Sequence, residues 1–227
     1  MYKYLLWDID GTVLNFLASE AYAIRALFKK YNLGECSDEM IKMYSEINIK
    51  YWQKLEKGEL TKQEILVGRF YEFFKIIGVD ISIVEKFNRE YQITLGDYIE
   101  FVENAKDILL SLKGKCTLAA VTNGTKVAQE KKLRLSGLCE IFDAIFISEN
   151  IGAEKPSKKF FDYVFEKLGI TDKREVLIIG DSLTGDMKGG YLAGIDTCWF
   201  NNEHNFNTLD FSVTYEIDHL DKIIDII

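Results

Sequence analysis

Short, wholly apolar runs alternate with amphipathic segments through most of the chain. The runs are Tyr4–Trp7, Cys116–Val121, Ala144–Ile147, Val176–Ile179 and Thr197–Phe200. Runs that are apolar on both faces are typical of buried strands in a parallel sheet, and their alternation with helices is typical of α/β folds. We therefore predict a Rossmann-like α/β core, in which helices cover both faces of a parallel sheet.

A different pattern fills residues 15–95, where apolar residues recur at helical spacing and no strand-like alternation interrupts them. The stretch is long enough for about four helices of ordinary length. We predict an all-helical insert over 15–95, shaped as a four-helix bundle, in a core domain built from residues 1–14 and 96–227.

Helix boundaries are marked by capping residues. Thr61 and Ser82 each precede a glutamate by three residues, which predicts a capping box at both sites. Further helices are predicted over Ala105–Leu112, up to about Ser136, from a cap at Ser157 to Leu168, and up to Ala193.

Composition and charge narrow the classes of protein. The chain is 48% hydrophobic and 28% charged, as in ordinary globular proteins, and has no apolar run long enough to span a membrane. Its net charge of −8 argues against nucleic-acid polymers as partners. Residues 15–95 hold equal numbers of basic and acidic residues, so the excess acid lies in the predicted core. Four cysteines without paired spacing predict buried, reduced thiols in a cytoplasmic protein. We expect a monomer or a homodimer.

Polar clusters follow four of the predicted strands. Their members are Asp8 and Asp10, Thr122 and Asn123, Lys155, and Asp181 and Asp186. Because ligands bind at the carboxyl ends of parallel strands, we expect these side chains to meet at one edge of the sheet.

Four carboxylates in one crevice would repel one another, and a divalent cation removes that difficulty. Hard oxygen ligands that leave room for water and phosphate suit Mg²⁺. The only histidines, His204 and His219, lie outside the clusters, which disfavours zinc or a histidine base.

Taken together, the clusters resemble the four motifs of the haloacid dehalogenase-like (HAD) hydrolase superfamily. The matching segments are Asp8-Ile-Asp10-Gly-Thr12, Thr122-Asn123-Gly124, Lys155-Pro156 and Gly180-Asp181-Ser182-x-x-x-Asp186. The helical insert looks like the C1 cap of that superfamily. The segment from Asp10 to Phe16 with Glu20, and the ending Trp199-Phe200-Asn201, are similar to the pyrimidine 5′-nucleotidase (YjjG-like) branch.

The resemblance implies a role for each position. Asp8 would attack phosphorus and form an aspartyl-phosphate, while Asp10 would serve as general acid and then general base. Thr122, Asn123 and Lys155 would bind the substrate phosphate. Mg²⁺ would be held by Asp8, by the backbone carbonyl of Asp10 and by Asp181, with Asp186 in support. The cap would close over the phosphate. Phe16 and Glu20 could face the substrate; alternatively, Phe16 packs at the hinge and Glu20 is a charge at the N-terminus of a helix.

The expected substrate is a small phosphorylated metabolite, and the leading hypothesis is a nucleoside 5′-monophosphate. A phosphatase of sugar phosphates or phosphoglycolate, and a β-phosphoglucomutase-like transferase, would use the same residues. A non-catalytic phosphate-binding sensor module is the alternative from another class. Dehalogenation is disfavoured, because it does not need the acid–base carboxylate of Asp10.

Overall fold

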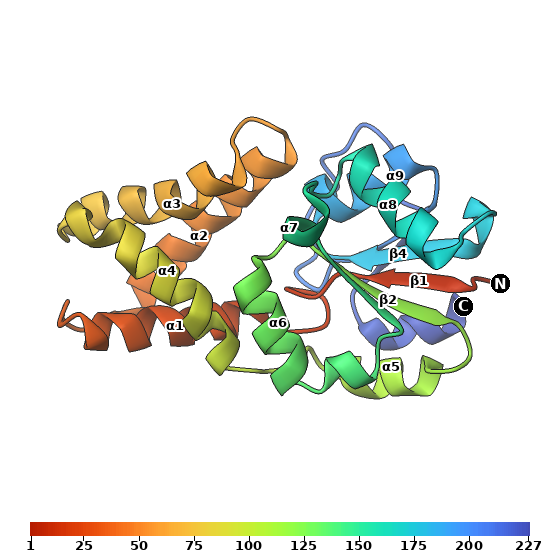
Figure 1. Cartoon of the computed structure of the whole chain (residues 1–227), viewed down its shortest axis with the longest axis horizontal. Coiled ribbons are helices and arrows are strands. Elements are labelled where there is room, and N and C mark those ends of the chain that lie inside the picture. Colours follow the sequence, from red (N-terminus) through yellow and green to blue (C-terminus); the bar gives the residue numbers. More distant parts are fainter. The chain divides into compact units, whose positions relative to one another are not determined.

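The computed structural model describes all 227 residues and divides into two compact units. The α/β unit comprises Met1–Asn15 and Glu100–Ile227, and the helical unit comprises Phe16–Ile99 (Figure 1). None of the helices combines the length and apolar character that crossing a membrane requires.

Six strands form one sheet, and every neighbouring pair is parallel. Their order across the sheet is β3-β2-β1-β4-β5-β6. The strands are β1 Tyr4–Trp7, β2 Thr117–Thr122, β3 Ala144–Ile147, β4 Val176–Gly180, β5 Asp196–Phe200 and β6 Tyr215–Ile217. The predicted parallel α/β fold is confirmed, and β6 is an additional edge strand that the apolar pattern did not indicate.

Helices cover both faces of this sheet. They are α5 Ala105–Leu112, α6 Lys126–Leu135, α7 Ser148–Ile151, α8 Lys158–Leu168 and α9 Lys188–Ala193, with a π-helical turn η5 Leu183–Met187 and the 3-10 turns η3 Leu138–Glu140, η4 Lys173–Glu175 and η6 Leu220–Asp225. In the α/β unit of Figure 1, α8 and α9 lie on one side of the strands and α5 on the other. Leu6 packs with residues of α8 on one face, while Leu5 and Trp7, which point the opposite way, are equally buried.

Strand β1 lies at the centre of the sheet and sets the position of the chemistry. Its last residue, Trp7, is in register with Ala120 of β2 and Ile179 of β4. The ladder continues one step further, where the backbone N–H of Asp8 donates to the carbonyl of Ile179 at 2.9 Å. In register, the three neighbouring strands therefore end within two residues of one another.

The helical unit contains four α-helices around an aromatic core. They are α1 Phe16–Lys30, α2 Asp38–Glu56, α3 Lys62–Ile77 and α4 Val84–Thr94, with the 3-10 turns η1 Ile81–Ile83 and η2 Leu95–Asp97. Tyr44 and Phe70 stack at a centroid distance of 4.8 Å, and Phe73, Phe74 and Phe87 are fully buried beside them. The aromatic side chains of α2, α3 and α4 thus hold this unit together more than any surface charge does.

Of the two predicted capping boxes, one is confirmed and one is wrong. Thr61 and Glu64 exchange the two expected hydrogen bonds at the start of α3. Ser82 instead lies inside η1, where its backbone N–H and its hydroxyl both donate to Asp80. Asp80 is the better cap because its carboxylate accepts two hydrogen bonds at once.

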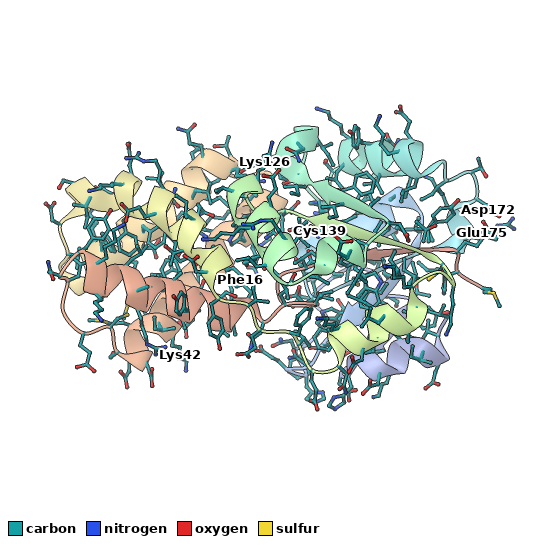
Figure 2. The ribbon with its side chains drawn as sticks, turned by 60° about the horizontal axis from the view of Figure 1, so that its bottom comes forward. Phe16, Lys42, Lys126, Cys139, Asp172 and Glu175 are labelled. Atoms are coloured by element: carbon teal, nitrogen blue, oxygen red, sulfur yellow. The ribbon has the colours of Figure 1, made fainter.

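The four cysteines form no disulfide, but they are not all buried. Cys36 and Cys198 are buried as expected, Cys116 is half-buried, and Cys139 is exposed in η3 (Figure 2). The prediction of uniformly buried thiols is therefore wrong for Cys139, which occupies a short surface turn between α6 and β3.

A buried polar chain crosses the interior of the helical unit. Asn48 of α2 donates to Glu20 of α1 at 2.7 Å and accepts from the guanidinium of Arg69 of α3 at 2.5 Å. The hydroxyl of Ser45 donates to the other carboxylate oxygen of Glu20. Glu20, Asn48 and Arg69 are each at most 1% exposed. Glu20 is therefore an interior hydrogen-bond acceptor, and it does not act as a charge at the start of α1.

We predict that Asn48→Ala destabilises the protein by about 2 kcal/mol, because it removes one hydrogen bond from each of two buried charged groups, Glu20 and Arg69. Urea unfolding followed by circular dichroism measures the loss, and hydrogen exchange in α1–α3 assigns it to the helical unit. Lys50→Ala, on the exposed side of the same helix, is the control and should change little. Equal stability of the two variants would contradict the importance of this polar chain.

Candidate functional site

Lys155 connects two of the predicted carboxylates at the end of the sheet. Its ammonium donates to Asp8 at 2.6 Å, to Asp186 at 2.6 Å and to the carbonyl of Val121 at 2.7 Å. All three of its N–H donors are therefore used, and the side chain is buried. The partners come from the loop after β1, from η5 after β4, and from β2, so three strand ends meet at one amine.

Asn123 fixes the backbone of Lys155. Its side-chain amide donates to the carbonyl of Lys155 at 2.9 Å, and its oxygen accepts from the Lys155 N–H at 2.8 Å. The following peptide bond, Lys155–Pro156, is cis. The side-chain oxygen and one amide N–H of Asn123 are therefore committed to the backbone of Lys155.

The π-helical turn η5 orients Asp186. The N–H of Ser182 donates to Asp186 Oδ2 at 3.2 Å, and the hydroxyl of Ser182 accepts from the N–H of Gly185 at 2.9 Å. Gly180 leaves the space this requires, because a Cβ there would lie 2.2 Å from Asp186 Oδ2. Both carboxylate oxygens of Asp186 are thus engaged within the protein, one by Ser182 and one by Lys155.

Asp181 is the exposed member of the acidic group. The hydroxyl of Thr12 lies 3.3 Å from Asp181 Oδ1, and the indole N–H of Trp199 donates to the Asp181 carbonyl at 3.0 Å. Gly11 adopts a left-handed φ of 99°, and a Cβ there would come within 2.5 Å of Asp181 Oδ2. The loop after β1 therefore needs glycine at this position both for its conformation and for its approach to Asp181.

Asp8, Asp181 and Asp186 bring one carboxylate oxygen each to within 4.8 Å of one another. Burial raises the pKa of Asp8 well above its usual value, and the carboxylates of Asp186 and Asp181 add to that effect against the opposing Lys155 ammonium. Burial alone would lower the pKa of Lys155, but the charges of Asp186 and Asp8 outweigh it and raise that pKa. Three carboxylates thus face one permanent ammonium, and a hard divalent cation is the ligand that this oxygen-rich group fits.

Asp10 lies outside this group and is bound by α6 instead. Gln129 Nε2 donates to Asp10 Oδ2 at 2.6 Å, and Lys132 Nζ donates to Asp10 Oδ1 at 2.6 Å. Neither residue is among those predicted from the sequence. Their spacing is the feature of the sequence that could have indicated a role. One face of α6 is buried and consists of Ala128, Gln129, Lys132 and Leu133, and two polar side chains on a buried face are unusual.

The remaining predicted residue, Thr122, is buried at the end of β2. Its hydroxyl accepts from the N–H of Gly124 at 3.0 Å and still has its own hydrogen to donate. Helix α6 begins two residues after Gly124, at Lys126 (Figure 2), whose N–H donates to Glu149 at 2.8 Å. The turn after β2 is therefore ordered by a hydrogen bond within the turn and, at the start of α6, by a hydrogen bond to Glu149 of α7.

Comparison with known proteins gives consistent matches over the whole chain. A model of the haloacid dehalogenase-like hydrolase family matches residues 5–200. YfnB of Bacillus subtilis, named only as a HAD-hydrolase, is 40% identical over 100% of this chain and 95% of its own length. Its crystal structure, described as bound to magnesium, has a TM-score of 0.93 at 39% identity, with 99% of this chain and 98% of that one covered.

Two relatives carry a named activity. The pyrimidine 5′-nucleotidase PynA of Streptococcus pneumoniae is 34% identical over 99% of this chain and 94% of its own length. The pyrimidine 5′-nucleotidase YjjG of Escherichia coli is 27% identical over 98% of this chain and 96% of its own length. Both matches therefore include the helical unit as well as the α/β unit.

We predict that Gly180→Ala destabilises the protein by about 3 kcal/mol or more, because the new methyl group displaces Asp186 from Lys155 and leaves buried charges unpaired. Gly169→Ala is the control. Gly169 has a φ of 66° and no atom within 4 Å of the added Cβ, so its cost is the backbone strain alone, about 1–2 kcal/mol. Urea unfolding measures both variants, and a smaller loss at Gly180 than at Gly169 would contradict the packing argument.

Proposed function

Because the chain belongs to the haloacid dehalogenase-like hydrolase family, we propose that it is a Mg²⁺-dependent phosphatase whose nucleophile is Asp8. The observation that carries the proposal is the convergence of Asp8, Lys155 and Asp186 within hydrogen-bonding distance, although they lie up to 178 residues apart in the chain. A buried amine between two carboxylates is a costly arrangement, which supports a role in chemistry more than one in stability alone.

The metal proposal is supported by the donors that are present. Asp8 and Asp181 would hold Mg²⁺ together with the backbone carbonyl of Asp10, whereas Asp186, with both oxygens engaged, would support Lys155. Bound Mg²⁺ would offset the excess negative charge and polarise the phosphoryl oxygens. Because Gly11 has no side chain, the loop after β1 can lie close to Asp181 and therefore to the acidic group.

In the first step, a carboxylate oxygen of Asp8 attacks phosphorus and the ester P–O bond breaks. Its electron pair remains on the leaving oxygen, which takes a proton from Asp10. In the second step, Asp10 takes a proton from water, the water oxygen bonds to phosphorus, and the bond from phosphorus to Asp8 breaks. Inorganic phosphate leaves, and both aspartates return to their starting states.

The phosphate itself would be bound at the end of β2. The hydroxyl of Thr122 and the N–H of Asn123 would donate to the phosphoryl oxygens, and Lys155 would offset their charge. Groups that are held in place before the reaction stabilise the charge of the transition state without having to reorganise. The hydrogen bonds that order Asn123 and Lys155 support this assignment, because they fix both residues in advance.

For the substrate, we propose nucleoside 5′-monophosphates, with pyrimidine nucleotides preferred. The activity that PynA and YjjG carry in their names supports this choice, since both align with the chain over nearly its full length. The substrate would be a small metabolite and not a nucleic-acid polymer, in keeping with the net charge of −8.

The decisive experiment measures phosphate release from pyrimidine and purine nucleoside 5′-monophosphates, sugar phosphates and phosphoglycolate, each with Mg²⁺ and with EDTA. We expect the highest kcat/KM with a pyrimidine nucleotide, complete loss in EDTA, and recovery on adding Mg²⁺. A preference for a sugar phosphate would refute the proposed substrate class but not the phosphatase activity. If no compound of the panel is hydrolysed, the proposed phosphatase activity itself is refuted.

We predict that Asp8→Asn lowers kcat/KM by more than about a hundredfold, because the amide cannot act as the nucleophile. Lys155→Met should also cost orders of magnitude. The controls are Asp162→Asn and Lys158→Ala, which change an exposed ion pair on α8 and should leave turnover intact. Circular dichroism must show that each variant is folded, and activity of Asp8→Asn near that of the wild type would refute its assignment.

A further inference from the structure

Two side chains of α6 bind the carboxylate that the proposed mechanism uses for proton transfer. Lys132 and Gln129 each donate to a different oxygen of Asp10, both at 2.6 Å. Lys132 is fully buried and Gln129 is 1% exposed. With a donor on each oxygen, the plane of the Asp10 carboxyl group is fixed as well as its position.

The local sequence builds this arrangement. Gln129 and Lys132 are three residues apart in a helix and so lie on the same face. Helix α6 begins just after Gly124, where a Cβ would lie 2.2 Å from the Nε2 atom of Gln129. The glycine is therefore required for the path of the Gln129 side chain toward Asp10, and the turn after β2 serves both the phosphate end of the site and the acid–base residue.

Stability alone does not account for these two residues. A lysine is almost never fully buried unless it is paired, and apolar residues of the same length would fill the same space at lower cost. The Oε1 atom of Gln129 is buried without a hydrogen-bond partner, although an unsatisfied acceptor of this kind costs about 1–3 kcal/mol. The hydrogen bond from Nε2 to Asp10 thus orients the Gln129 amide, and this orientation leaves Oε1 without a donor.

We propose that Lys132 and Gln129 are positioning residues, which hold the Asp10 carboxyl group in the orientation from which it transfers a proton to the leaving oxygen. They act through Asp10 and do not touch the reacting atoms. The inference rests on the proposed function, since it requires Asp10 to be the general acid. Correct orientation matters because proton transfer in the transition state requires the donor to lie within hydrogen-bonding reach of the leaving oxygen.

Substrates with different leaving groups distinguish a positioning role from a purely structural one. Only a positioning role makes the loss of kcat/KM depend on the leaving group. The 5′-oxygen of a nucleotide leaves as a strongly basic alkoxide and needs the proton, whereas 4-nitrophenolate is a weak base and leaves without one. The kcat/KM value reports the step in which the ester bond breaks. A residue that positions the acid must therefore affect kcat/KM for the nucleotide far more than for 4-nitrophenyl phosphate.

We predict that Lys132→Met lowers kcat/KM for the nucleotide by about 10²-fold, at the lower end of typical acid–base contributions, and that for 4-nitrophenyl phosphate much less. Gln129→Leu should show the same selectivity with a smaller loss. Lys126→Met makes the same substitution at an exposed site on the same helix and should leave both values unchanged. Equal losses on the two substrates, no loss, or a gain with the nucleotide would overturn the proposal.

A double variant tests whether Lys132 acts through Asp10. If it does, adding Lys132→Met to Asp10→Asn should not lower kcat/KM for the nucleotide any further, whereas independent effects would multiply. Urea unfolding of all variants separates loss of folding from loss of activity. If Asp10→Asn is selective for the nucleotide and Lys132→Met is not, this inference fails alone. If Asp10→Asn shows no selectivity, the proposed general acid fails with it.

Discussion

Lys155 brings a full positive charge into the interior of the α/β unit, and its three hydrogen bonds go to groups from three different segments. A buried ammonium is tolerated only where every donor has a partner, so the ends of β1, β2 and β4 must all be in place at once. The interaction therefore links the fold to the site: the register of the sheet brings the partners together, and the charge requires that register. Neither Asp8 nor Asp186 could remain buried as a carboxylate without the amine.

The surrounding residues can be understood as the means of holding this charge in position. Asn123 fixes the backbone on either side of the lysine, and the absence of a side chain at Gly180 admits Asp186. The π-helical turn then presents Asp186 to the lysine, which agrees with the frequent occurrence of π-turns at functional sites. Trp199 of β5 anchors the carbonyl of Asp181 from the next strand. Each contact uses a group at or near a strand end, so the precision of the site derives from the rigid sheet.

The strands and the acidic group were predictable from the sequence because both depend on a simple rule, that apolar parallel strands end together and carry polar residues at their carboxyl ends. The rule does not extend to side chains supplied by helices. Lys132 reads as an ordinary solvated lysine, since spacing alone does not reveal which helix face a sheet will cover. Glu20 has the same ambiguity, and only its contacts in the helical unit show that it is buried. Strand β6 was not predictable, because it has only three residues, one of them a glutamate, and so shows no apolar run.

Asp8 and Asp10 are two residues apart, yet their surroundings differ in a way that suits different tasks. The proposed nucleophile, Asp8, has to be ionised and to lie beside the groups that would bind phosphate. The Lys155 ammonium serves both needs, against the burial and the neighbouring carboxylates that raise the pKa of Asp8. The carboxyl group of the proposed proton donor, Asp10, would be drawn away from the leaving group if its oxygens were shared with the metal ion that the acidic group would hold. Asp10 is not among the three carboxylates that could hold one ion, and it has a separate amine and an amide on α6. The two carboxylates of one short loop are therefore held separately, Asp8 by Lys155 and Asp10 by Lys132 and Gln129, and this separation is what their two proposed roles require.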